Sequence, residues 1–448
     1  KEEDECNTDF ERWIYILKHM KGIRTMEFQT KLLHGKAVDN YANGSTVPPI
    51  SLANAFAYES SEQLEKVFQN RAPGFAYTRI ANPTVDAFER RVNELEGGIG
   101  GVACSSGMSA VTLSLLNILQ AGDEVIAGSA LFGGTLDLLH DLEAIGIKVH
   151  FIPRVEKALI EPFLTDKTRA VFGEIVGNPA LNVMDVRETA DFLHGKGVPL
   201  IVDSTTSTPY LLNPIQYGAD VVVHSTSKYI NGSGDAISGI IIDSGNFDWD
   251  AYGHKYHGLT EPDESYHGVV YTKQFGKKAY ITKATTQLMR DLGSIPSPEN
   301  CFLLNLGLET LPLRVERHCE NAQKVAEFLD AHEKVSHVIY AGLPNDKYHE
   351  LAQKYMDKGR TCGVISFELT GGRDAAVRFM DGLKLANIAT HVAASKTMVL
   401  HPASHTHRQM NDEQLREAGV SPGMIRLSVG IESAKDIIND LKEALENA

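Results

Sequence analysis

Apolar residues in the middle of the chain form short unbroken runs that alternate with longer segments of helical period. The runs EVIAG at 124–128, RAVFGEI at 169–175 and VPLIVDS at 198–204 are separated by segments such as TLDLLHDLEAIG at 135–146. Continuous apolar runs are typical of parallel strands buried on both faces, and the helical segments are typical of crossover connections. The pattern predicts an α/β fold with a mostly parallel sheet.

The last third of the chain has a different pattern. After a Gly-, His- and Tyr-rich linker at about 246–268, Ser297 followed by Pro298 predicts the start of a long helix. Later apolar segments and an amphipathic C-terminal helix predict a smaller α+β domain. We therefore divide the chain into an N-terminal extension at 1–25, an N-terminal segment at 26–75, a large domain at 76–296 and a small domain at 297–448.

Composition and charge narrow the classes of partner. The 448 residues include 43 Lys and Arg against 58 Asp and Glu, a net charge of −15, which argues against a nucleic acid or an anionic membrane as partner. The cysteines are scattered without a CxxC pair, so we expect neither a zinc site nor a disulfide framework. We expect a cytoplasmic location, where thiols stay reduced. The five cysteines are Cys6, Cys104, Cys301, Cys319 and Cys362.

Neither a membrane span nor a metal site is predicted. The longest uncharged stretch, at 97–122, is interrupted by Ser, Thr, Asn and Gly, which do not suit a transmembrane helix. His401, His405 and His407 have metal-like spacing, but no carboxylate or cysteine follows them closely. We therefore expect no metal.

The run ADVVVHS at 219–225 delivers a lysine to the end of a buried strand. Ser225 and Ser227 precede Lys228, and a glycine-bearing loop follows. Burial disfavours the charged ammonium form, so such a lysine is a nucleophile toward carbonyl carbon. The neighbouring hydroxyls suit a phosphate. The alternative is a solvated lysine at an ordinary strand end.

Two further segments could bind a charged ligand. Ser106, Gly107 and Met108 precede an apolar helix, where free backbone N–H groups suit a phosphate, although an ordinary helix cap explains them as well. Asp203 ends the strand VPLIVD, and a buried carboxylate requires a cationic partner. A protonated pyridine nitrogen and a metal ion both fit that requirement.

Together with AYTRIANPT at 76–84, these features resemble the Cys/Met-metabolism family of pyridoxal-phosphate enzymes. The resemblance covers 26–448 and implies pyridoxal-phosphate fold type I, as in aspartate aminotransferase. It implies that Lys228 carries the cofactor and is catalytic, and that Tyr77 and Arg79 reach the phosphate of a neighbouring subunit. A homo-oligomer, a dimer of dimers, is therefore expected. The implied cofactor-binding residues are Tyr77, Arg79, Ser106, Gly107, Met108, Phe132, Asn178, Asp203, Ser225, Ser227 and Lys228.

Within this family, several blocks look like the O-acetylhomoserine sulfhydrylase subgroup. They are EIVGNPALNV at 174–183, GLTEPDESYHGV at 258–269, GLETLPLRVERH at 307–318 and VLHPASHTHRQM at 399–410. That resemblance implies γ-replacement on O-acetylhomoserine by sulfide or a small thiol, giving homocysteine or methionine and acetate. It also implies that the substrate contacts Asn178, Thr397 and Arg426, with the arginine on the α-carboxylate.

Two other functions remain open on the sequence. One is a γ-lyase acting on methionine or cystathionine, against which stands Gly134, where methionine γ-lyases usually carry cysteine. The other is a pyridoxal-phosphate-binding protein without catalysis. Two departures from the family pattern affect the substrate: Phe132 replaces a tyrosine that usually stacks on the cofactor, and 393–396 lacks the expected acidic and arginine residues. The lost hydroxyl leads us to expect a bias toward ester substrates, since acetate leaves without a proton donor.

Overall fold

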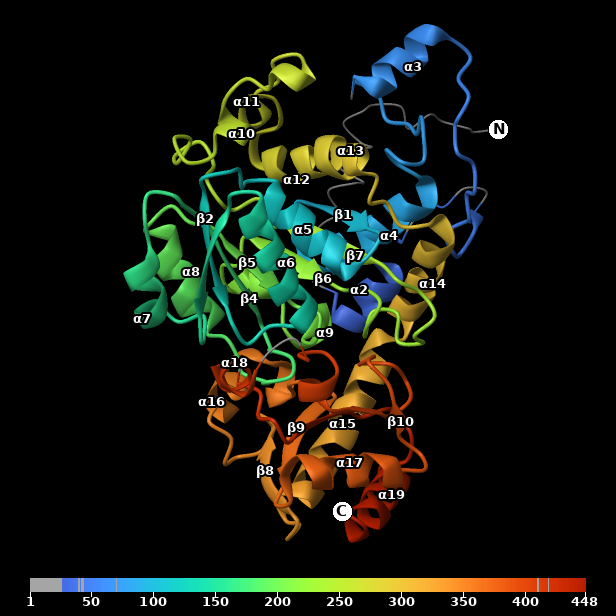
Figure 1. Cartoon of the computed structure of the whole chain (residues 1–448). Coiled ribbons are helices and arrows are strands. Elements are labelled where there is room, and N and C mark those ends of the chain that lie inside the picture. Colours follow the sequence, from blue (N-terminus) through green and yellow to red (C-terminus); the bar gives the residue numbers. More distant parts are fainter. Residues whose placement is uncertain (1–25, 39–40, 42–43, 70, 409–410, 418) are drawn as a thin grey trace, which may run out of the picture.

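The computed structural model describes residues 26–448 except 39–40, 42–43, 70, 409–410 and 418, so the predicted N-terminal extension at 1–25 lies outside the described residues. Figure 1 shows two parts, one around a large sheet and one around a smaller sheet that contains the C-terminus. The predicted α/β fold, with a mostly parallel sheet and a smaller α+β part, is confirmed.

The large sheet has seven strands in the order β1-β7-β6-β5-β4-β2-β3. All neighbouring pairs from β6 to β3 are parallel, and β7 runs antiparallel to both β1 and β6. The parallel strands end at one edge of the sheet, which is where ligands bind in folds of this class. The strands are β1 (Gly100–Cys104), β2 (Glu124–Gly128), β3 (Lys148–Ile152), β4 (Thr168–Glu174), β5 (Leu200–Asp203), β6 (Val221–His224) and β7 (Gly239–Asp243).

Helices cover both faces of the large sheet. Val222 of β6 contributes to one hydrophobic core with Phe88 of α4, whereas Val221 and Val223 contribute to another core with Val111 of α5. This alternation explains the unbroken apolar runs, because every second side chain of a strand needs its own apolar layer. The covering helices include α2 (Phe28–His34), α4 (Pro83–Glu96), α5 (Gly107–Leu116), α6 (Gly133–Ala144) and α8 (Val186–His194).

The smaller sheet has the order β10-β11-β12-β9-β8 and is antiparallel except for the β10/β11 pair. Apolar side chains of α15, α17 and α19 form a separate core with it. Its strands are β8 (Val335–Ile339), β9 (Val364–Leu369), β10 (Asn387–Ile388), β11 (Met398–Leu400) and β12 (Met424–Ser428), and its helices are α15 (Leu311–Asp330), α16 (His349–Tyr355), α17 (Gly372–Gly382), α18 (Asp412–Glu417) and α19 (Ala434–Glu446).

A helix pair joins the two parts. The helix predicted to start at Ser297 is α14 (Pro298–Glu309), and the Ser297 side chain caps it by accepting a hydrogen bond from the Asn300 N–H. This helix packs against α4 of the large part, whereas α15 packs against β8 and α19 of the small part. The predicted domain boundary at 297 stays a prediction. The contacts of the two helices change from the large part to the small part between α14 and α15.

The remaining helices lie around the large sheet and at its N-terminal side. The segment α10 to α13, which includes a π-helical stretch, follows the linker and lies near α3 in Figure 1. The remaining α-helices and the π-helical stretch η6 are α3 (Ser61–Phe68), α7 (Lys157–Ile160), α9 (Thr208–Leu211), α10 (His257–Thr260), α11 (Tyr271–Phe275), α12 (Ala279–Lys283), η6 (Ala284–Met289) and α13 (Arg290–Leu292).

Candidate active site

A cavity of about 550 Å³ lies at the carboxyl ends of β4, β5 and β6, below the N-terminus of α5. Strand β12 of the small sheet and the segment at 390–392 complete its wall. The structure therefore brings most of the predicted site residues into one cavity, although they are up to 320 positions apart in sequence. Those that line it are Ser106, Gly107, Met108, Phe132, Asn178, Asp203, Ser225, Ser227, Lys228 and Arg426.

Lys228 lies in the turn that follows β6. Its backbone N–H donates to the Ser225 carbonyl (3.2 Å), and its amine Nζ lies 3.1 Å from Nδ1 of His391. Burial, and then the nearby Arg426 cation, lower the pKa of the Lys228 amine to about 8. About a tenth of this amine is therefore uncharged at pH 7, far more than for an exposed lysine, which agrees with the nucleophile expected from the sequence.

The N-terminus of α5 forms one wall of the cavity. The Ser106 side chain caps the helix by accepting from the Ser109 N–H (3.1 Å), which leaves the Gly107 and Met108 amides at the helix start. A Cβ atom on Gly107 would lie 2.5 Å from Cβ of Ser225, so only glycine permits this close approach. The two segments predicted to hold a phosphate therefore meet here, at the positive end of a helix.

Two carboxylates lie side by side across the strand ends. Glu174 of β4 and Asp203 of β5 are register partners, and the pKa of each is raised by burial. Asp203 accepts from the Thr205 N–H (2.8 Å), and Glu174 accepts from the Phe132 and Asn178 N–H groups (2.7 and 2.9 Å). Neither carboxylate forms an ion pair within the part of the chain that the structure describes. A cationic group bound in the cavity would supply that partner.

Arg426 of β12 faces these groups from the small sheet. It is buried, and its guanidinium donates to Oδ1 of Asn178 and to the carbonyls of Thr390 and His391, each at 3.3 Å. Burial lowers its pKa to about 10, so it remains a cation at neutral pH. No carboxylate among the described residues pairs with it, and its Nε has no hydrogen-bond partner there. A buried guanidinium in this state suits a carboxylate ligand.

Phe132 precedes α6 and is held at its backbone by Glu174. The residue is 38% exposed and lines the cavity, where its ring is available for stacking on a planar ligand. A Cβ atom on Gly134 would lie 2.8 Å from Cε1 of this ring, so the glycine provides space for the aromatic group.

Three predicted site residues do not line the cavity. Tyr77 is 42% exposed, and the Arg79 guanidinium donates to the Arg290 carbonyl, so both lie at the surface of the single chain. Thr397 is buried behind the cavity, where its hydroxyl donates to Glu432 (2.9 Å) and accepts from the Gly430 N–H. The Thr397 hydroxyl therefore serves a local hydrogen-bond network in the small sheet.

Several cavity residues were not predicted. Glu174 had the same signal as Asp203, a carboxylate at the end of a buried run, and that signal could have been used. Thr205 accepts from the Ser225 N–H (2.7 Å) and links the two strand ends. His391 and Asp235 lie in irregular segments without a hydrophobic period. Only the tertiary structure shows that both line the cavity and that His391 contacts Lys228.

The donor set of this cavity fits pyridoxal phosphate. The helix start and the hydroxyls of 225–227 suit its phosphate, the carboxylate of Asp203 suits its pyridine nitrogen, and the Lys228 amine suits its aldehyde carbon. Ser227 is also tied to its own loop, because its hydroxyl donates to the Ser238 carbonyl (3.1 Å) and accepts from the Ser238 N–H (3.0 Å). The buried carboxylate pair and the close approach at Gly107 are both explained by such a ligand.

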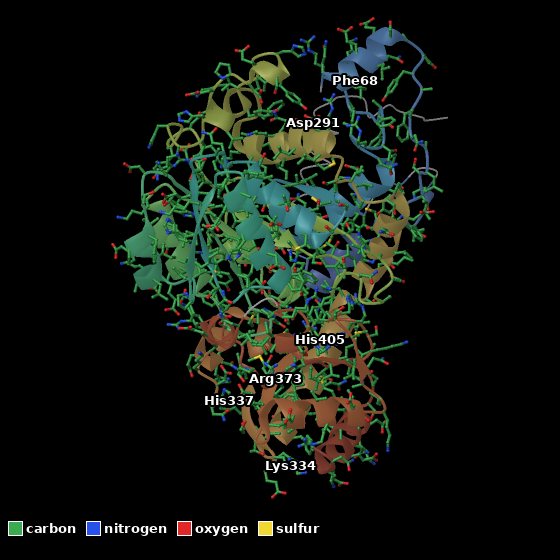
Figure 2. The ribbon with its side chains drawn as sticks, in the orientation of Figure 1. Phe68, Asp291, Lys334, His337, Arg373 and His405 are labelled. Atoms are coloured by element: carbon green, nitrogen blue, oxygen red, sulfur yellow. The ribbon has the colours of Figure 1, made fainter. Side chains whose placement is uncertain are left out.

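Among the described residues, no helix is long and apolar enough to cross a membrane. The same part of the chain contains no group of three or more His, Cys, Asp or Glu side chains placed to hold a metal ion. The ring nitrogens of His401 are engaged by Ser404 and the Pro422 carbonyl, and the exposed His405 lies where the two parts of the chain meet (Figure 2).

Comparisons with known proteins agree with this geometry. The family model described as "Cys/Met metabolism PLP-dependent enzyme" matches residues 29–446. The chain is 42% identical to O-acetyl-L-homoserine sulfhydrylase of Leptospira meyeri, over 95% of this chain and 98% of that protein. It is 40% identical to homocysteine synthase of Schizosaccharomyces pombe, over 95% of this chain and 100% of that protein.

A solved structure is also similar. It is a putative O-acetylhomoserine (thiol)-lyase from Campylobacter jejuni that contains N'-pyridoxyl-lysine-5'-monophosphate, with a TM-score of 0.91 and 35% identity over 94% of this chain and 100% of that chain. The pyridoxal-phosphate cavity, the fold and these matches lead to one conclusion: the chain belongs to the Cys/Met-metabolism family of PLP-dependent enzymes.

Proposed function

We propose that this enzyme carries out γ-replacement, in which O-acetylhomoserine and hydrogen sulfide give homocysteine and acetic acid. A small thiol in place of sulfide gives the corresponding thioether, methionine from methanethiol. The observation that carries the proposal is a buried arginine, Arg426, whose guanidinium faces the same cavity as the Lys228 amine and has no carboxylate partner among the described residues. The names of relatives at about 40% identity support the choice of substrate.

The cofactor would be held by residues at each end of the cavity. The amides of Gly107 and Met108, the cap Ser106 and the hydroxyls of Ser225 and Ser227 suit the phosphate. In the same arrangement Asp203 would pair with the pyridine nitrogen, Phe132 would stack on the ring and Asn178 would lie on the side of the phenolic oxygen. When bound, the cofactor supplies the electron sink that makes hydrogens of the bound amino acid acidic.

The side chains of this protein then bind, orient and move protons. Arg426 binds the α-carboxylate, and Asn178 fixes the guanidinium from the other side. The Lys228 amine, uncharged in part near pH 7, removes the α-proton and then a β-proton, so that acetate leaves, and it returns one proton to each of these carbons after sulfide has added. The partly buried cavity limits access of water to the reacting carbons.

The γ-lyase alternative has less support from the cavity. Methionine γ-lyases usually carry cysteine at the position of Gly134, and here a Cβ atom at that position would lie 2.8 Å from the Phe132 ring. A cysteine therefore requires the ring to move, and no described contact favours a thioether over an ester. For the third possibility, a pyridoxal-phosphate-binding protein without catalysis, the buried Arg426 cation has no evident use, because attachment of the cofactor at Lys228 does not require it.

Location and assembly belong to the same proposal. The charge, the scattered cysteines without a CxxC pair and the biosynthetic relatives support a cytoplasmic enzyme. We place Tyr77 and Arg79 on the phosphate of a neighbouring subunit in a homotetramer built as a dimer of dimers. The exposure of the Tyr77 ring, 42%, is consistent with a surface that a second copy covers.

Product analysis tests the proposed reaction. Protein loaded with pyridoxal phosphate is given O-acetylhomoserine with and without sulfide and, separately, methionine and cystathionine without sulfide. We expect homocysteine from the ester only when sulfide is present. If 2-oxobutyrate came mainly from the thioethers, the enzyme would be a γ-lyase, and a loaded protein that changed no substrate would be a binding protein.

A further inference from the structure

A histidine outside every predicted motif contacts the lysine at the centre of the cavity. Nδ1 of His391 lies 3.1 Å from Nζ of Lys228, and His391 lines the same cavity. The other ring nitrogen, Nε2, is buried and has no hydrogen-bond partner among the described residues. The lysine amine is therefore the one side-chain partner that the described structure gives to this ring.

The backbone of His391 is held by a strand that also carries the proposed substrate arginine. Arg426 of β12 donates to the carbonyls of Thr390 and His391, and two residues later Ser428 accepts from the Ala393 N–H (2.8 Å). Ala393 has a φ of 65°, a left-handed conformation that costs about 1 kcal/mol for a residue other than glycine. Contacts on both sides of His391 thus hold its main chain in place next to Lys228.

We propose that His391 is a positioning residue that accepts a hydrogen bond from the Lys228 amine and aims it at the substrate. The catalytic consequence rests on the proposed function, whereas the contact itself does not. Because the Arg426 guanidinium also holds the His391 carbonyl, the site for the α-carboxylate and the orientation of the base share one support. A substrate bound at Arg426 then presents its α-carbon to an amine whose direction is already set.

Charge favours this direction of the hydrogen bond. Burial, with Lys228 and Arg426 nearby, lowers the pKa of His391 to about 4, so its ring is neutral at pH 7 and one nitrogen is free to accept. A charged donor makes the stronger bond, so the ring favours the ammonium form of Lys228 more than an apolar neighbour would. The other ionisable groups that line the cavity are Glu174, Asp203, Asp235 and Arg426, and a variant of His391 leaves all of them in place.

The contact can be tested without turnover. In the full chain purified without added cofactor, the rate at which an amine-reactive probe, trinitrobenzenesulfonate, labels Lys228 is followed against pH by peptide mass spectrometry. His391→Leu keeps an apolar bulk that excludes water but removes the acceptor, so we expect the apparent pKa of Lys228 to fall by about one unit. Labelling at pH 7 then rises about fivefold, because more of the amine is uncharged.

A second variant and a control separate the hydrogen bond from simple packing. His391→Asn retains an acceptor oxygen, and we expect its labelling curve to approach that of the unaltered protein. His405→Leu changes an exposed histidine outside the cavity and should change nothing. Equal curves for His391→Leu and the unaltered protein would overturn the proposal, and so would equal curves for His391→Leu and His391→Asn.

Kinetics of the loaded enzyme give the second readout. For His391→Leu we expect kcat with O-acetylhomoserine and sulfide to fall about tenfold while KM for the ester stays within about twofold, because Arg426 is untouched. Retention of the cofactor should be unchanged. A rise in KM with an unchanged kcat would overturn a positioning role. If the unaltered protein turned over no ester, the proposed function would fail while the labelling experiment still decided the contact.

Discussion

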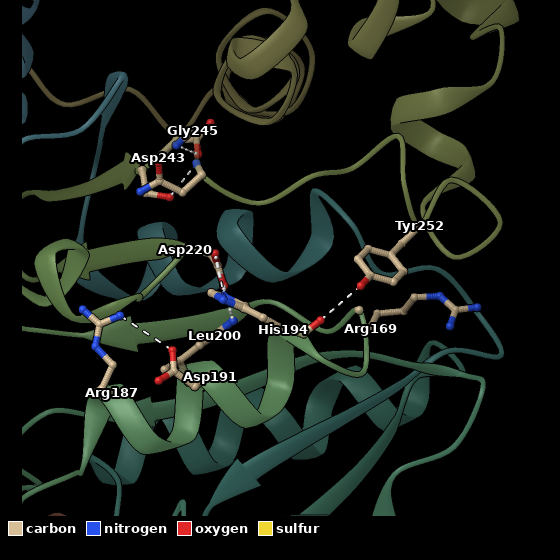
Figure 3. Close-up of polar contacts among 12 residues, drawn as sticks. Arg169, Arg187, Asp191, His194, Leu200, Asp220, Asp243, Gly245 and Tyr252 are labelled. Atoms are coloured by element: carbon tan, nitrogen blue, oxygen red, sulfur yellow. Dashed lines mark hydrogen bonds and ion pairs between the residues drawn. The ribbon is translucent and has the colours of Figure 1, made fainter.

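Two aspartates lie at opposite edges of the large sheet, one at each end of its parallel strands. Asp203 ends β5 at the cavity, and Asp220 precedes β6 at the other edge, beside the first residue of β5. Asp220 accepts from Nε2 of His194 (2.9 Å) and from the Leu200 N–H (2.8 Å), and Figure 3 shows these partners around it. The Tyr252 hydroxyl in turn donates to the His194 carbonyl, so the whole group is tied together.

Asp203, at the edge that carries the cavity, has different neighbours. Asp203 accepts from one backbone N–H, and the side chain opposite it is a second carboxylate, Glu174. Burial raises the pKa of both Asp203 and Asp220, but at Asp220 the nearby His194 opposes the rise. At the Asp220 edge the protein thus supplies the hydrogen-bond partners of the carboxylate, and these bonds contribute to stability. The Asp203 edge leaves a carboxylate pair and an arginine without an ion-pair partner among the described residues, and a bound ligand can supply one.

Lys228→Ala should give the largest effect, because it removes the group that attaches the cofactor and moves the protons. We expect kcat to fall by about 10⁴-fold, the upper range for loss of a positioned acid or base. Borohydride should no longer fix cofactor to the peptide that contains residue 228. Lys283→Ala, a change at a partly buried lysine away from the cavity, is the matched control. Turnover that survived in Lys228→Ala would refute the assigned role.

Asp203→Asn and Asp220→Asn compare the two edges directly. We expect the first to lower kcat about a hundredfold with little change in stability, because a carboxylate that stabilises a bound cation is lost. The second should leave kcat nearly unchanged and lower the free energy of unfolding by about 1.5 kcal/mol, since His194 is partly exposed and its hydrogen bond is only partly shielded. Urea unfolding and steady-state kinetics of both variants measure this; the reverse pattern would contradict the comparison.

The pH dependence of stability should also distinguish the edges. The hydrogen bond that the His194 ring donates to Asp220 raises the pKa of His194, so the folded protein binds more protons than the unfolded chain near and above pH 6.5. The stabilisation from this pair is therefore fully present below about pH 6.5 and is lost as the pH rises through the raised pKa of His194. We expect the free energy of unfolding to fall over that interval. In Asp220→Asn this part of the decrease should disappear, and a decrease of the same size in both proteins would show that another group causes it.

Phe132→Tyr should give the smallest effect and changes the cavity alone. It restores a hydroxyl beside the cofactor ring without removing the aromatic face, so we expect thioether turnover to rise about fivefold relative to ester turnover, the value of one hydrogen bond. Parallel assays with O-acetylhomoserine and cystathionine measure the ratio, and Phe132→Leu controls for loss of stacking. An unchanged ratio in Phe132→Tyr would show that the missing hydroxyl does not bias the substrate.

Motifs within single segments were the easiest part of the site to predict. Ser106, Gly107 and Met108 begin a helix, and Asp203 and Lys228 follow buried strands, so the local pattern alone placed them at ligand-binding ends of elements. No such local signal marks Thr397, whose expected substrate contact came from the family resemblance and stays a prediction; in the structure its hydroxyl donates to Glu432 and accepts from the Gly430 N–H. A side chain in an irregular loop has no period from which its direction can be inferred.

The sequence by itself determined the order of strands and helices, the caps of α5 and α14, and the residue types at the strand ends, because these follow from local periodicity and backbone chemistry. Only the tertiary structure decided which side chains meet. Asn178 and Arg426 are 248 positions apart and share a hydrogen bond, and Lys228 and His391 are 163 positions apart at 3.1 Å. Such contacts depend on how the small sheet packs against the large one, and that packing is a sum over many apolar contacts which no single segment contains.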